Sequence, residues 1–525
     1  MIEVARQSPL TRLKSFFSDG ISAILRSDTV CVENRSWFSK TIGRLKTIHE
    51  KGRNMSTQKT KPIIVVIFAF VTIMLMLNWA GTAVTLPSDQ TPYQVKDIYA
   101  GSSSSEPQDI TVFGDRVLFA ANDGIHGSEL WISDGTESGT YMLKDLFPGP
   151  DSSDPSQLFV YDGKLFFQAT DTPTTRRLWI TDGTEAGTVT HNIGVTPNTS
   201  NITEMNGLLY FVAITGMDFS EKLWVSDGTQ AGTSIVKELD PYISDVSNLQ
   251  AIGNQLFFEA WGNNYGRELW VSDGTESGTG LVKDINPGDA DSDADILGSL
   301  GNDVIFAATD DVNGRELWRS DGTETGTMLI KDIDPNHDFL SPNYLANLNG
   351  TLLFTASDGI HGGELWISDG TEEGTALLKD INPGSPSSYP YAKFVVNETV
   401  YFFADDGVHG WELWKSDGTS EGTMLVQDSN PGSDGSLGGA LRSIGETIYY
   451  VSDDFTHGYE LWISDGTDAG TYMLQDINPS GPSTPQFLAM TSQRLFFSAD
   501  DGQNGRELWA VQFFEHQVFL PMTIR

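Results

Sequence analysis

Short stretches in which apolar and polar residues alternate run through most of this chain and return in each unit of a repeat. In one unit the stretches are Ala440–Ile444, Thr447–Ser452, Glu460–Ser464 and Thr471–Ile477. Each has the length and the apolar or β-branched content of a strand. In the third strand Leu461 and Ile463 point to one face and Trp462 points to the other. Since both faces carry large apolar side chains, the pattern predicts small sheets that are buried on both sides.

A Leu-Trp pair marks the third strand of each unit, and successive pairs are 45 to 48 residues apart. Such a period is the mark of a repeat architecture, and four strands in about 47 residues are typical of a propeller blade. We therefore predict an all-β propeller of about nine four-stranded blades, although about 4–8 blades is the usual number. The tryptophans predicted to be structural are Trp131, Trp179, Trp224, Trp270, Trp318, Trp366, Trp414, Trp462 and Trp509.

Between the third and fourth strands lies the most regular string of the sequence, Asp-Gly-Thr-x-x-Gly-Thr. Asp can accept hydrogen bonds from the backbone ahead of it, and Gly adopts the positive φ that a tight turn needs. The string therefore predicts a structural hairpin. It begins at Asp134, Asp182, Asp227, Asp273, Asp321, Asp369, Asp417 and Asp465.

The two ends of the repeat indicate how a ring would close. Tyr93–Ile98 matches a fourth strand but has no first three strands before it, whereas the last unit runs through Trp509 and lacks the hairpin. We predict that the N-terminal strand completes the last blade. The alternative for this strand is Gln517–Met522. Two smaller rings or an open array are the alternatives for the arrangement of the units.

Charge divides the chain into a basic N-terminal part and an acidic remainder. Residues 1–61 carry 12 Lys and Arg against 5 Asp and Glu, which leaves 20 against 66 for the rest. So acidic a surface repels nucleic acid and anionic membranes, which excludes a nucleic-acid partner. Cys31 is the single cysteine of the sequence, so no intrachain disulfide can form.

An apolar run at 62–84 follows the basic segment and predicts export of the repeats. Residues 63–77 hold no charge, and the extended run is just long enough for a membrane span of roughly 20 residues. As a signal-anchor it would keep residues 1–61 in the cytoplasm. With Met55 as the true start it would be a signal peptide, cleaved near Gly81-Thr82-Ala83. Both readings place the repeats outside the cell, secreted or anchored to the membrane by one helix. The predicted order is then the basic segment 1–61, the apolar segment 62–84, a linker 85–92, the propeller 93–511 and an extension 512–525.

These residues resemble the bacterial ELWxxDGT repeat family, named for Glu-Leu-Trp-x-x-Asp-Gly-Thr. The resemblance covers about residues 93–511, and six units carry the full string, for example Glu364–Thr371. Units two and three depart from it with Arg177 and Lys222 in place of Glu, and unit nine has no hairpin. The resemblance implies a secreted or surface-exposed propeller-like protein without an established enzymatic activity. It supplies no catalytic residues.

Acidic residues gather in the loop between strands two and three and before the Leu-Trp pair. Oxygen-rich loops of this kind suit calcium, which takes 6–8 oxygen ligands. The spacing differs from that of a calcium-binding loop, however, and Asx turns, solvated caps or salt bridges explain the same residues. No cofactor is required by the sequence. The possible calcium ligands are Asp123, Glu129, Asp358, Glu364, Asp405, Asp406, Glu412, Asp453, Asp454, Glu460, Asp500, Asp501 and Glu507.

Four histidines occupy one equivalent place in this loop: His126, His361, His409 and His457. One imidazole per blade cannot form a zinc site, which needs three or four ligands at one point. We expect these histidines to pack or to hydrogen-bond within the turn.

Two functions remain in view for an exported acidic propeller. The favoured one is a non-enzymatic interaction or adhesion scaffold that binds an extracellular protein or glycan through similar loops on several blades. The alternative is a propeller enzyme acting on extracellular polysaccharide, a glycosidase or lyase. The stretch Asp171–Tyr242 differs most from the repeat and is the predicted place for a partner-specific role. Its basic residues include Arg176, Arg177, Lys222 and Lys237.

Overall fold

The structure is a computed structural model that describes residues 90–513, apart from 174, 194, 196–197, 215–220, 239–245, 336–341 and 437. All of these residues belong to one unit, Pro87–Arg525. The predicted segments 1–61 and 62–84 lie outside the described residues, as do most of the linker and the extension. Within the described part of the chain, no helix is long and apolar enough to cross a membrane.

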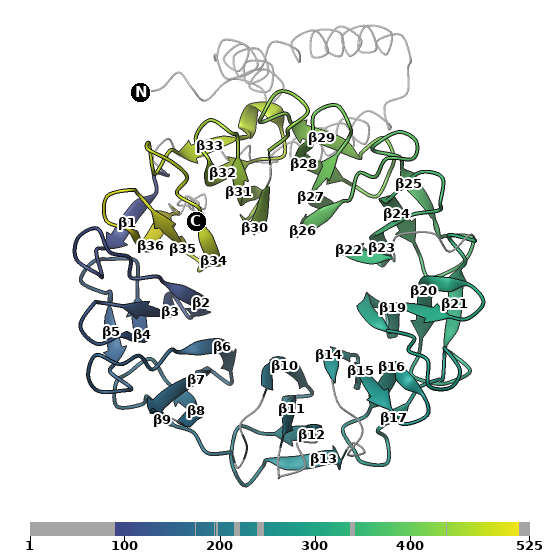
Figure 1. The fold of residues 1–525 in the computed structure, drawn as a ribbon, viewed down its shortest axis with the longest axis horizontal. Coiled ribbons are helices and arrows are strands. Elements are labelled where there is room, and N and C mark those ends of the chain that lie inside the picture. Colours follow the sequence, from purple (N-terminus) through teal and green to yellow (C-terminus); the bar gives the residue numbers. More distant parts are fainter. Residues whose placement is uncertain are drawn as a thin grey trace, which may run out of the picture. The chain divides into compact units, whose positions relative to one another are not determined.

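The described residues form nine four-stranded antiparallel sheets arranged as the blades of one β-propeller (Figure 1). In each blade the first strand lies nearest the centre of the ring and the fourth lies at its outer edge. Blades 1 to 3 consist of β2 (Gln108–Phe113), β3 (Arg116–Asn122), β4 (Ser128–Ser133) and β5 (Tyr141–Lys144); β6 (Ser156–Tyr161), β7 (Lys164–Thr172), β8 (Thr175–Thr181) and β9 (Val189–Thr190); and β10 (Asn198–Met205), β11 (Leu208–Ile214), β12 (Glu221–Ser226) and β13 (Ser234–Glu238).

Blades 4 to 6 follow the same order. They consist of β14 (Ser247–Ile252), β15 (Gln255–Gly262), β16 (Gly266–Ser272) and β17 (Gly280–Leu281); β18 (Asp295–Leu300), β19 (Asp303–Asp310), β20 (Gly314–Ser320) and β21 (Met328–Lys331); and β22 (Asn343–Leu348), β23 (Thr351–Ala356), β24 (Glu364–Ser368) and β25 (Ala376–Lys379).

Blades 7 to 9 complete the ring. They consist of β26 (Tyr391–Val396), β27 (Thr399–Asp405), β28 (Trp411–Ser416) and β29 (Met424–Gln427); β30 (Gly438–Ile444), β31 (Thr447–Asp453), β32 (Tyr459–Ser464) and β33 (Tyr472–Gln475), with a 3₁₀ turn at Asp468–Gly470; and β34 (Gln486–Met490), β35 (Arg494–Asp500), β36 (Arg506–Gln512) and β1 (Tyr93–Lys96).

The ring closes through the N-terminal strand, as predicted. β1 pairs antiparallel with β36, with Tyr93 opposite Ala510, and so takes the fourth place in blade 9. The alternative that Gln517–Met522 supplies this strand is wrong, because β1 already holds that edge of β36; residues 517–522 themselves lie outside the described residues. The single ring in Figure 1 also excludes two smaller rings.

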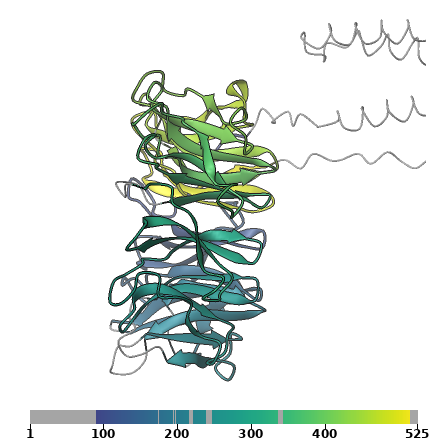
Figure 2. The same ribbon diagram turned by 90° about the vertical axis from the view of Figure 1, so that its right-hand side faces the viewer.

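Successive blades pack face to face, and the alternation seen in the sequence is the reason (Figure 2). Leu118, Leu130 and Ile132 of blade 1 contact the face of blade 2 that carries Phe167 and Trp179. The opposite face of blade 1, with Phe119 and Trp131, packs instead on blade 9. The tryptophan indoles are largely buried, as predicted; Trp366, for example, is 5% exposed.

Lysines at the end of the outer strands add a polar tie between blades that the sequence pattern did not reveal. Lys331 Nζ donates to the carbonyl of Thr375 in the next blade at 2.7 Å, and Lys379 donates likewise to Thr423. Lys96 on β1 donates to Thr140 of blade 1 at 2.8 Å, so the same tie spans the closure of the ring. The acceptor in each case belongs to the Asp-Gly-Thr hairpin.

The Asp-Gly-Thr hairpin is structural, as predicted. Asp369 Oδ1 accepts from the backbone N–H and the hydroxyl of Thr371, at 2.9 and 2.7 Å. Gly370 has φ +85°, which favours glycine. The second glycine has a different role, because a Cβ on Gly374 would lie 2.0 Å from an Asp369 carboxylate oxygen. Both glycines are therefore required by the turn itself.

Candidate binding surface of the repeat loops

In seven of the nine blades a glutamate precedes the Leu-Trp pair, and it is buried and holds the crossover loop that leads to the next blade. Glu364 is 0% exposed. Its Oε2 accepts from Ile381 N at 2.7 Å and from Ser388 Oγ at 2.6 Å, and its Oε1 accepts from Ser388 N at 2.8 Å. Donors from crossover loops reach the equivalent carboxylates in the same way: Glu129, Glu268, Glu316, Glu412, Glu460 and Glu507. Backbone and hydroxyl donors thus take the place of the salt bridges that the sequence left open.

Burial raises the pKa of six of these glutamates to about 7, while the hydrogen bonds from the crossover loop act in the opposite direction. The six are Glu129, Glu268, Glu316, Glu364, Glu412 and Glu507. The pKa of Glu460 is raised for the same reason. A carboxyl that titrates near neutral pH can serve as a general acid. These carboxyls, however, are buried beneath their crossover loops and make similar contacts in seven blades, so the fold itself explains them.

The loop between strands two and three is closed by a hydrogen bond between an aspartate and a histidine. His361 Nδ1 lies 2.7 Å from Asp358 Oδ2, and the same pair is formed by His126 and Asp123, His409 and Asp406, and His457 and Asp454. Asn313 and Asn504 bind Asp310 and Asp501 in the same way at 2.8 Å. The predicted hydrogen-bonding role of the histidines is confirmed.

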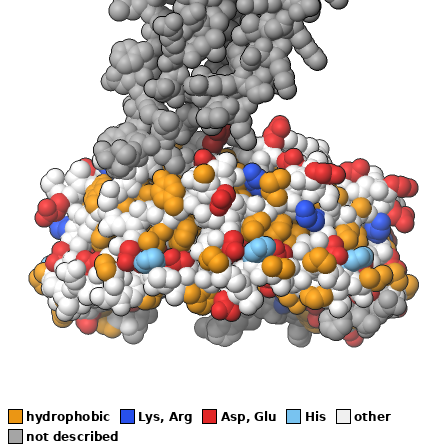
Figure 3. Space-filling model, turned by 90° about the horizontal axis from the view of Figure 1, so that it is seen from above, with side chains coloured by type: hydrophobic (Ala, Val, Ile, Leu, Met, Phe, Trp, Pro, Cys, Tyr) orange, Lys and Arg blue, Asp and Glu red, His pale blue; other side chains and the backbone are white. Residues whose placement is uncertain are grey.

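The hydrogen bond between the two side chains changes the pKa of both the histidine and the aspartate. The hydrogen bond to Asp358 raises the pKa of His361. Burial alone would raise the pKa of Asp358. Hydrogen bonds from the backbone N–H groups of Ile360 and His361 and from the His361 ring lower it. Histidine side chains stand apart along the rim in Figure 3, each beside acidic side chains, as expected for one imidazole per blade.

The remaining acidic residues of this loop cap its backbone. Asp405 Oδ1 accepts from Gly407 N, Asp453 Oδ1 from Phe455 N and Asp500 Oδ1 from Gly502 N, each at 2.7 Å. The structure thus brings the acidic loop residues and the buried glutamates to the same end of each blade but gives each a protein donor. Among the described residues no three His, Cys, Asp or Glu side chains form a group that could hold a metal ion. Calcium binding stays a prediction.

A row of exposed apolar residues lies at the tips of the same loops, and sequence reasoning missed it. Ile125, Val312, Ile360 and Val408 directly precede the His or Asn of the pair and are 65–70% exposed. In blade 8 Phe455, one position earlier in the loop, is 56% exposed. We call these five residues the rim array. The signal was present as the apolar third residue of Asp-Gly-x-His-Gly.

The basic residues of the divergent stretch are engaged within the fold. Arg177 pairs with Asp171 at 3.2 Å, and Arg176 donates to the carbonyl of Asp154 at 2.9 Å. Lys237 donates to Thr279 of the next blade at 2.7 Å, the same tie that the other outer strands make. In blade 3 Glu221, one residue before Lys222, accepts from Val246 N at 2.7 Å and so replaces part of the missing glutamate contact. These contacts explain the departures from the repeat by local structure.

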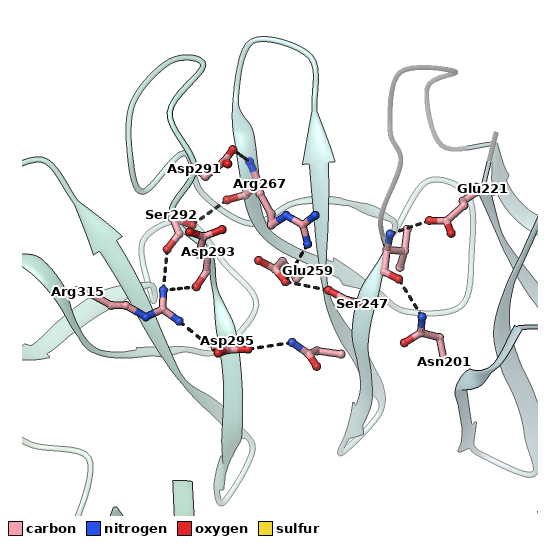
Figure 4. A network of polar contacts seen from close by, with 12 residues as sticks. Asn201, Glu221, Ser247, Glu259, Arg267, Asp291, Ser292, Asp293, Asp295 and Arg315 are labelled. Carbon is pink, nitrogen blue, oxygen red and sulfur yellow. Dashed lines mark hydrogen bonds and ion pairs between the residues drawn. The ribbon is translucent and has the colours of Figure 1, made fainter. Parts of the chain in front are cut away.

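Polar side chains also line the inner strands where they begin. Figure 4 shows Arg315 between Ser292, Asp293 and Asp295, and Arg267 beside Glu259. A recess of about 510 Å³ opens on the inner strands of blades 4 to 6. Its lining consists of Gln250, Asp295, Ile296, Leu297, Gly298, Ser299, Asn343 and Asn347.

Comparison with known proteins assigns neither a family nor an activity. No family model and no curated protein matches this sequence. Among solved structures, a computationally designed protein, Ika8, is 14% identical with a TM-score of 0.39, over 80% of this chain and 99% of that one. Puromycin hydrolase is 12% identical with a TM-score of 0.36, over 77% of this chain and 60% of that one.

A further similar structure is the β-propeller domain of the Trilobed protease from Pyrococcus furiosus, which is 13% identical with a TM-score of 0.33, over 63% of this chain and all of that domain. The resemblance to the ELWxxDGT repeat family stays a prediction.

Proposed function

We propose that this chain is a non-enzymatic scaffold that is exposed outside the cell and binds an extracellular protein or glycan through loops repeated on several blades. The observation that carries the proposal is the rim array. Val312, Ile360 and Val408 stand at the same loop tip in three consecutive blades and are 65–70% exposed. A partner that spans these blades would meet the same apolar contact on each of them, so that several weak contacts act together.

The loops under the rim array support this function because they are held rigid. Each tip is fixed by the hydrogen bond between the aspartate and the histidine or asparagine, for example Asn313 Nδ2 to Asp310 Oδ2 at 2.8 Å. The glutamate below fixes the crossover loop of the same blade. A surface ordered before binding loses little conformational entropy when a partner docks, and several equal contacts add avidity.

The proposal is tested with the full chain immobilised on a surface and probed with arrays of extracellular proteins and glycans. Bound ligands are then recovered and examined by mass spectrometry for cleavage. We expect intact ligands, and a stepwise loss of avidity in Val312→Ser, then Val312→Ser with Ile360→Ser, then the triple variant with Val408→Ser. Cleaved glycan would favour the polysaccharide-degrading alternative, and undiminished avidity in the triple variant would refute the role of the rim array.

A further inference from the structure

Three neighbouring aromatic residues of blade 7 lie beside its rim loop, two of them exposed tyrosines and the third a partly buried tryptophan that packs against the core of the blade. Tyr389 is 48% exposed, Tyr391 is 37% exposed and Trp411 is half-buried. The Tyr389 and Trp411 rings are stacked, with centroids 6.4 Å apart and planes 19° apart, and the Tyr391 ring meets Trp411 edge-on at 5.0 Å. We call these three residues the aromatic platform.

The platform is fixed from below by the core of the blade. Tyr391 packs on the fully buried Phe403, with centroids 5.8 Å apart, and its hydroxyl donates to the carbonyl of Gly438 in blade 8 at 2.9 Å. The carbonyl of Trp411 accepts from Ser436 N at 2.6 Å. The neighbouring Glu412 is buried and accepts from Ser436 Oγ at 2.6 Å. The exposed rings therefore sit on a rigid support.

The position of Tyr389 is an unusual one for an aromatic residue. Its φ is +43°, in the left-handed region, and it precedes a proline. Asp154 and Asp293 occupy the equivalent place in blades 2 and 5 with φ +47°. Glu106 and Thr484 hold this place in blades 1 and 9 with φ +48° and +42°, so the backbone conformation belongs to the repeat and the aromatic side chain is what sets blade 7 apart.

We infer that the aromatic platform binds an uncharged sugar chain, with the pyranose rings stacked on Tyr389, Tyr391 and Trp411. The apolar C–H face of a pyranose packs against an aromatic ring, and pockets for such ligands combine aromatic walls with a few polar groups. Asp405 supplies one polar group. It lies opposite Trp411 in the register of β27 and β28, and its carboxylate can accept hydrogen bonds from sugar hydroxyls. The inference deepens the proposed function, because it names one ligand class and its place on the scaffold.

The size and charge of the surface favour a neutral glycan over a protein or an acidic glycan. Three partly exposed rings offer roughly 200–300 Å² of aromatic surface. A stable protein interface needs about 800 Å² on each side, whereas the smaller area matches a few sugar rings. The chain has a formal net charge of −39, which repels anionic polysaccharides.

Neighbouring blades offer hydrogen-bonding groups along which such a sugar chain can extend. Asn343 opens β22 opposite Thr355, in the register that Tyr391 has in β26 opposite Phe403. Asp295 holds the same place in blade 5, opposite Ala307. Both are exposed and line the recess on the inner strands. Consecutive blades therefore present an aromatic ring, an amide and a carboxylate at one level of the propeller.

The test is isothermal titration of the full chain with neutral gluco-, manno- and galacto-hexaoses, with hexagalacturonate as the anionic comparison. The variants Trp411→Arg and Tyr389→Asp install residues that blades 5 and 2 carry at these positions, so both are expected to fold normally. We expect binding of at least one neutral hexaose, weakened roughly tenfold or more in each variant, because aromatic anchors carry much of the binding free energy of a small interface. Tyr141→Ser is the matched control: it removes a tyrosine that is 45% exposed on the outer strand of blade 1, installs the residue that opens the outer strand of blade 3, and should bind the hexaose as the parent chain does.

Three results would overturn the inference: no neutral hexaose bound at millimolar concentration, a preference for hexagalacturonate, or unchanged affinity in Trp411→Arg. If the hexaose binding is lost in the rim-array triple variant but kept in Trp411→Arg, the platform inference fails while the proposed scaffold function stands. If the platform variants lose the hexaose and the triple variant keeps its array partners, the scaffold role of the rim array fails and the sugar site stands.

Discussion

Blades 5 and 7 carry different residues at the same two positions, and the difference separates structure from candidate function. In blade 5 Arg315 donates to the carbonyls of Ser292 and Asp293 and pairs with Asp295 at 3.4 Å, so the arginine binds the chain to itself (Figure 4). In blade 7 Trp411 stands where blade 5 has Arg315, and Tyr389 stands where blade 5 has Asp293. The two aromatic rings stack on each other. Arg506 in blade 9 behaves like Arg315, donating to the carbonyl of Thr484 at 2.9 Å.

The lesson is that nine copies of one blade provide their own controls. A residue that recurs with the same contacts, such as the buried glutamate, is explained by the fold. A residue that departs from the repeat and leaves its side chain exposed is not explained by the fold. On this reasoning blade 7 differs from blades 2 and 3, whose departures are absorbed by local contacts such as the pair of Arg177 with Asp171.

The largest effect is expected at a recurring position. Trp366→Ala should lower the free energy of unfolding by about 3–5 kcal/mol, the range for removal of a buried aromatic side chain. Trp366 is 5% exposed and packs against the preceding blade beside Leu297, Ile305 and Leu317. Chemical denaturation measures the change. A melt indistinguishable from that of the parent chain would show that the recurring tryptophans do not hold the blades together.

A smaller loss is expected when one crossover glutamate is changed. In Glu364→Gln the amide N–H₂ must face donors from either Ile381 or Ser388, so at least one hydrogen bond to the carboxylate is lost. Hydrogen bonds to charged groups contribute about 1.5–3 kcal/mol each, and we expect a cost of about 2 kcal/mol. Glu373→Gln, on the exposed hairpin of the same blade, is the control. Equal melting temperatures for the two variants would contradict the role of Glu364.

The raised pKa values of these glutamates predict the pH dependence of stability. Because the folded-state pKa is about 7 and the ordinary value is 4.5, the folded chain binds more protons than the unfolded chain between these limits. Stability therefore falls as pH rises through this window. The histidines act in the same direction, because their raised pKa gives stability that is present below pH 6.5 and lost above it. Calorimetry should show a melting temperature several degrees higher at pH 5.5 than at pH 8, and the opposite slope would contradict the burial of these carboxyls.

The effect of calcium on the melting temperature tests whether the recurring acidic residues bind this ion in addition to holding the loops. Since the loop aspartates and the crossover glutamates accept protein donors, we expect a melting temperature that differs by less than about 1 °C between calcium and a chelator. A ligand at 100 times its dissociation constant would add about 2.7 kcal/mol, which calorimetry detects easily. A shift of that size would restore the calcium prediction and require the loops to rearrange.

The repeat made most of the fold predictable, because each alternating stretch has to bury two faces and each Asp-Gly-Thr string has to turn. The predicted strand Glu460–Ser464 lies within β32 (Tyr459–Ser464), and the N-terminal strand closes the ring as predicted. The last strand of that unit ends at Gln475 rather than at Ile477, since the Ile477 N–H donates to Glu460 instead of continuing the sheet.

The candidate sites were less predictable, since polarity alone does not reveal burial. Glu364 shares a strand face with Trp366, but the serine that satisfies it stands 24 residues later in a crossover without periodicity. The sequence therefore offers Glu364 as a possible calcium ligand, whereas the structure buries its carboxylate under the crossover loop. The aromatic platform follows no repeat and could be found only as an exception, such as the extra tryptophan directly before Glu412-Leu413-Trp414.

Among the substitutions, the smallest loss of stability is expected where the comparison between blades is sharpest. Trp411→Ala makes the same chemical change as Trp366→Ala, one blade further on, yet Trp411 is only partly buried against the core of blades 7 and 8. Because part of the indole already lies in solvent, less buried apolar area is lost than at Trp366, and we expect a smaller cost of about 1 kcal/mol. Chemical denaturation of the two variants side by side checks the contrast. If Trp411→Ala costs as much as Trp366→Ala, the platform is part of the core, and the argument that its exposed rings await a ligand loses its basis.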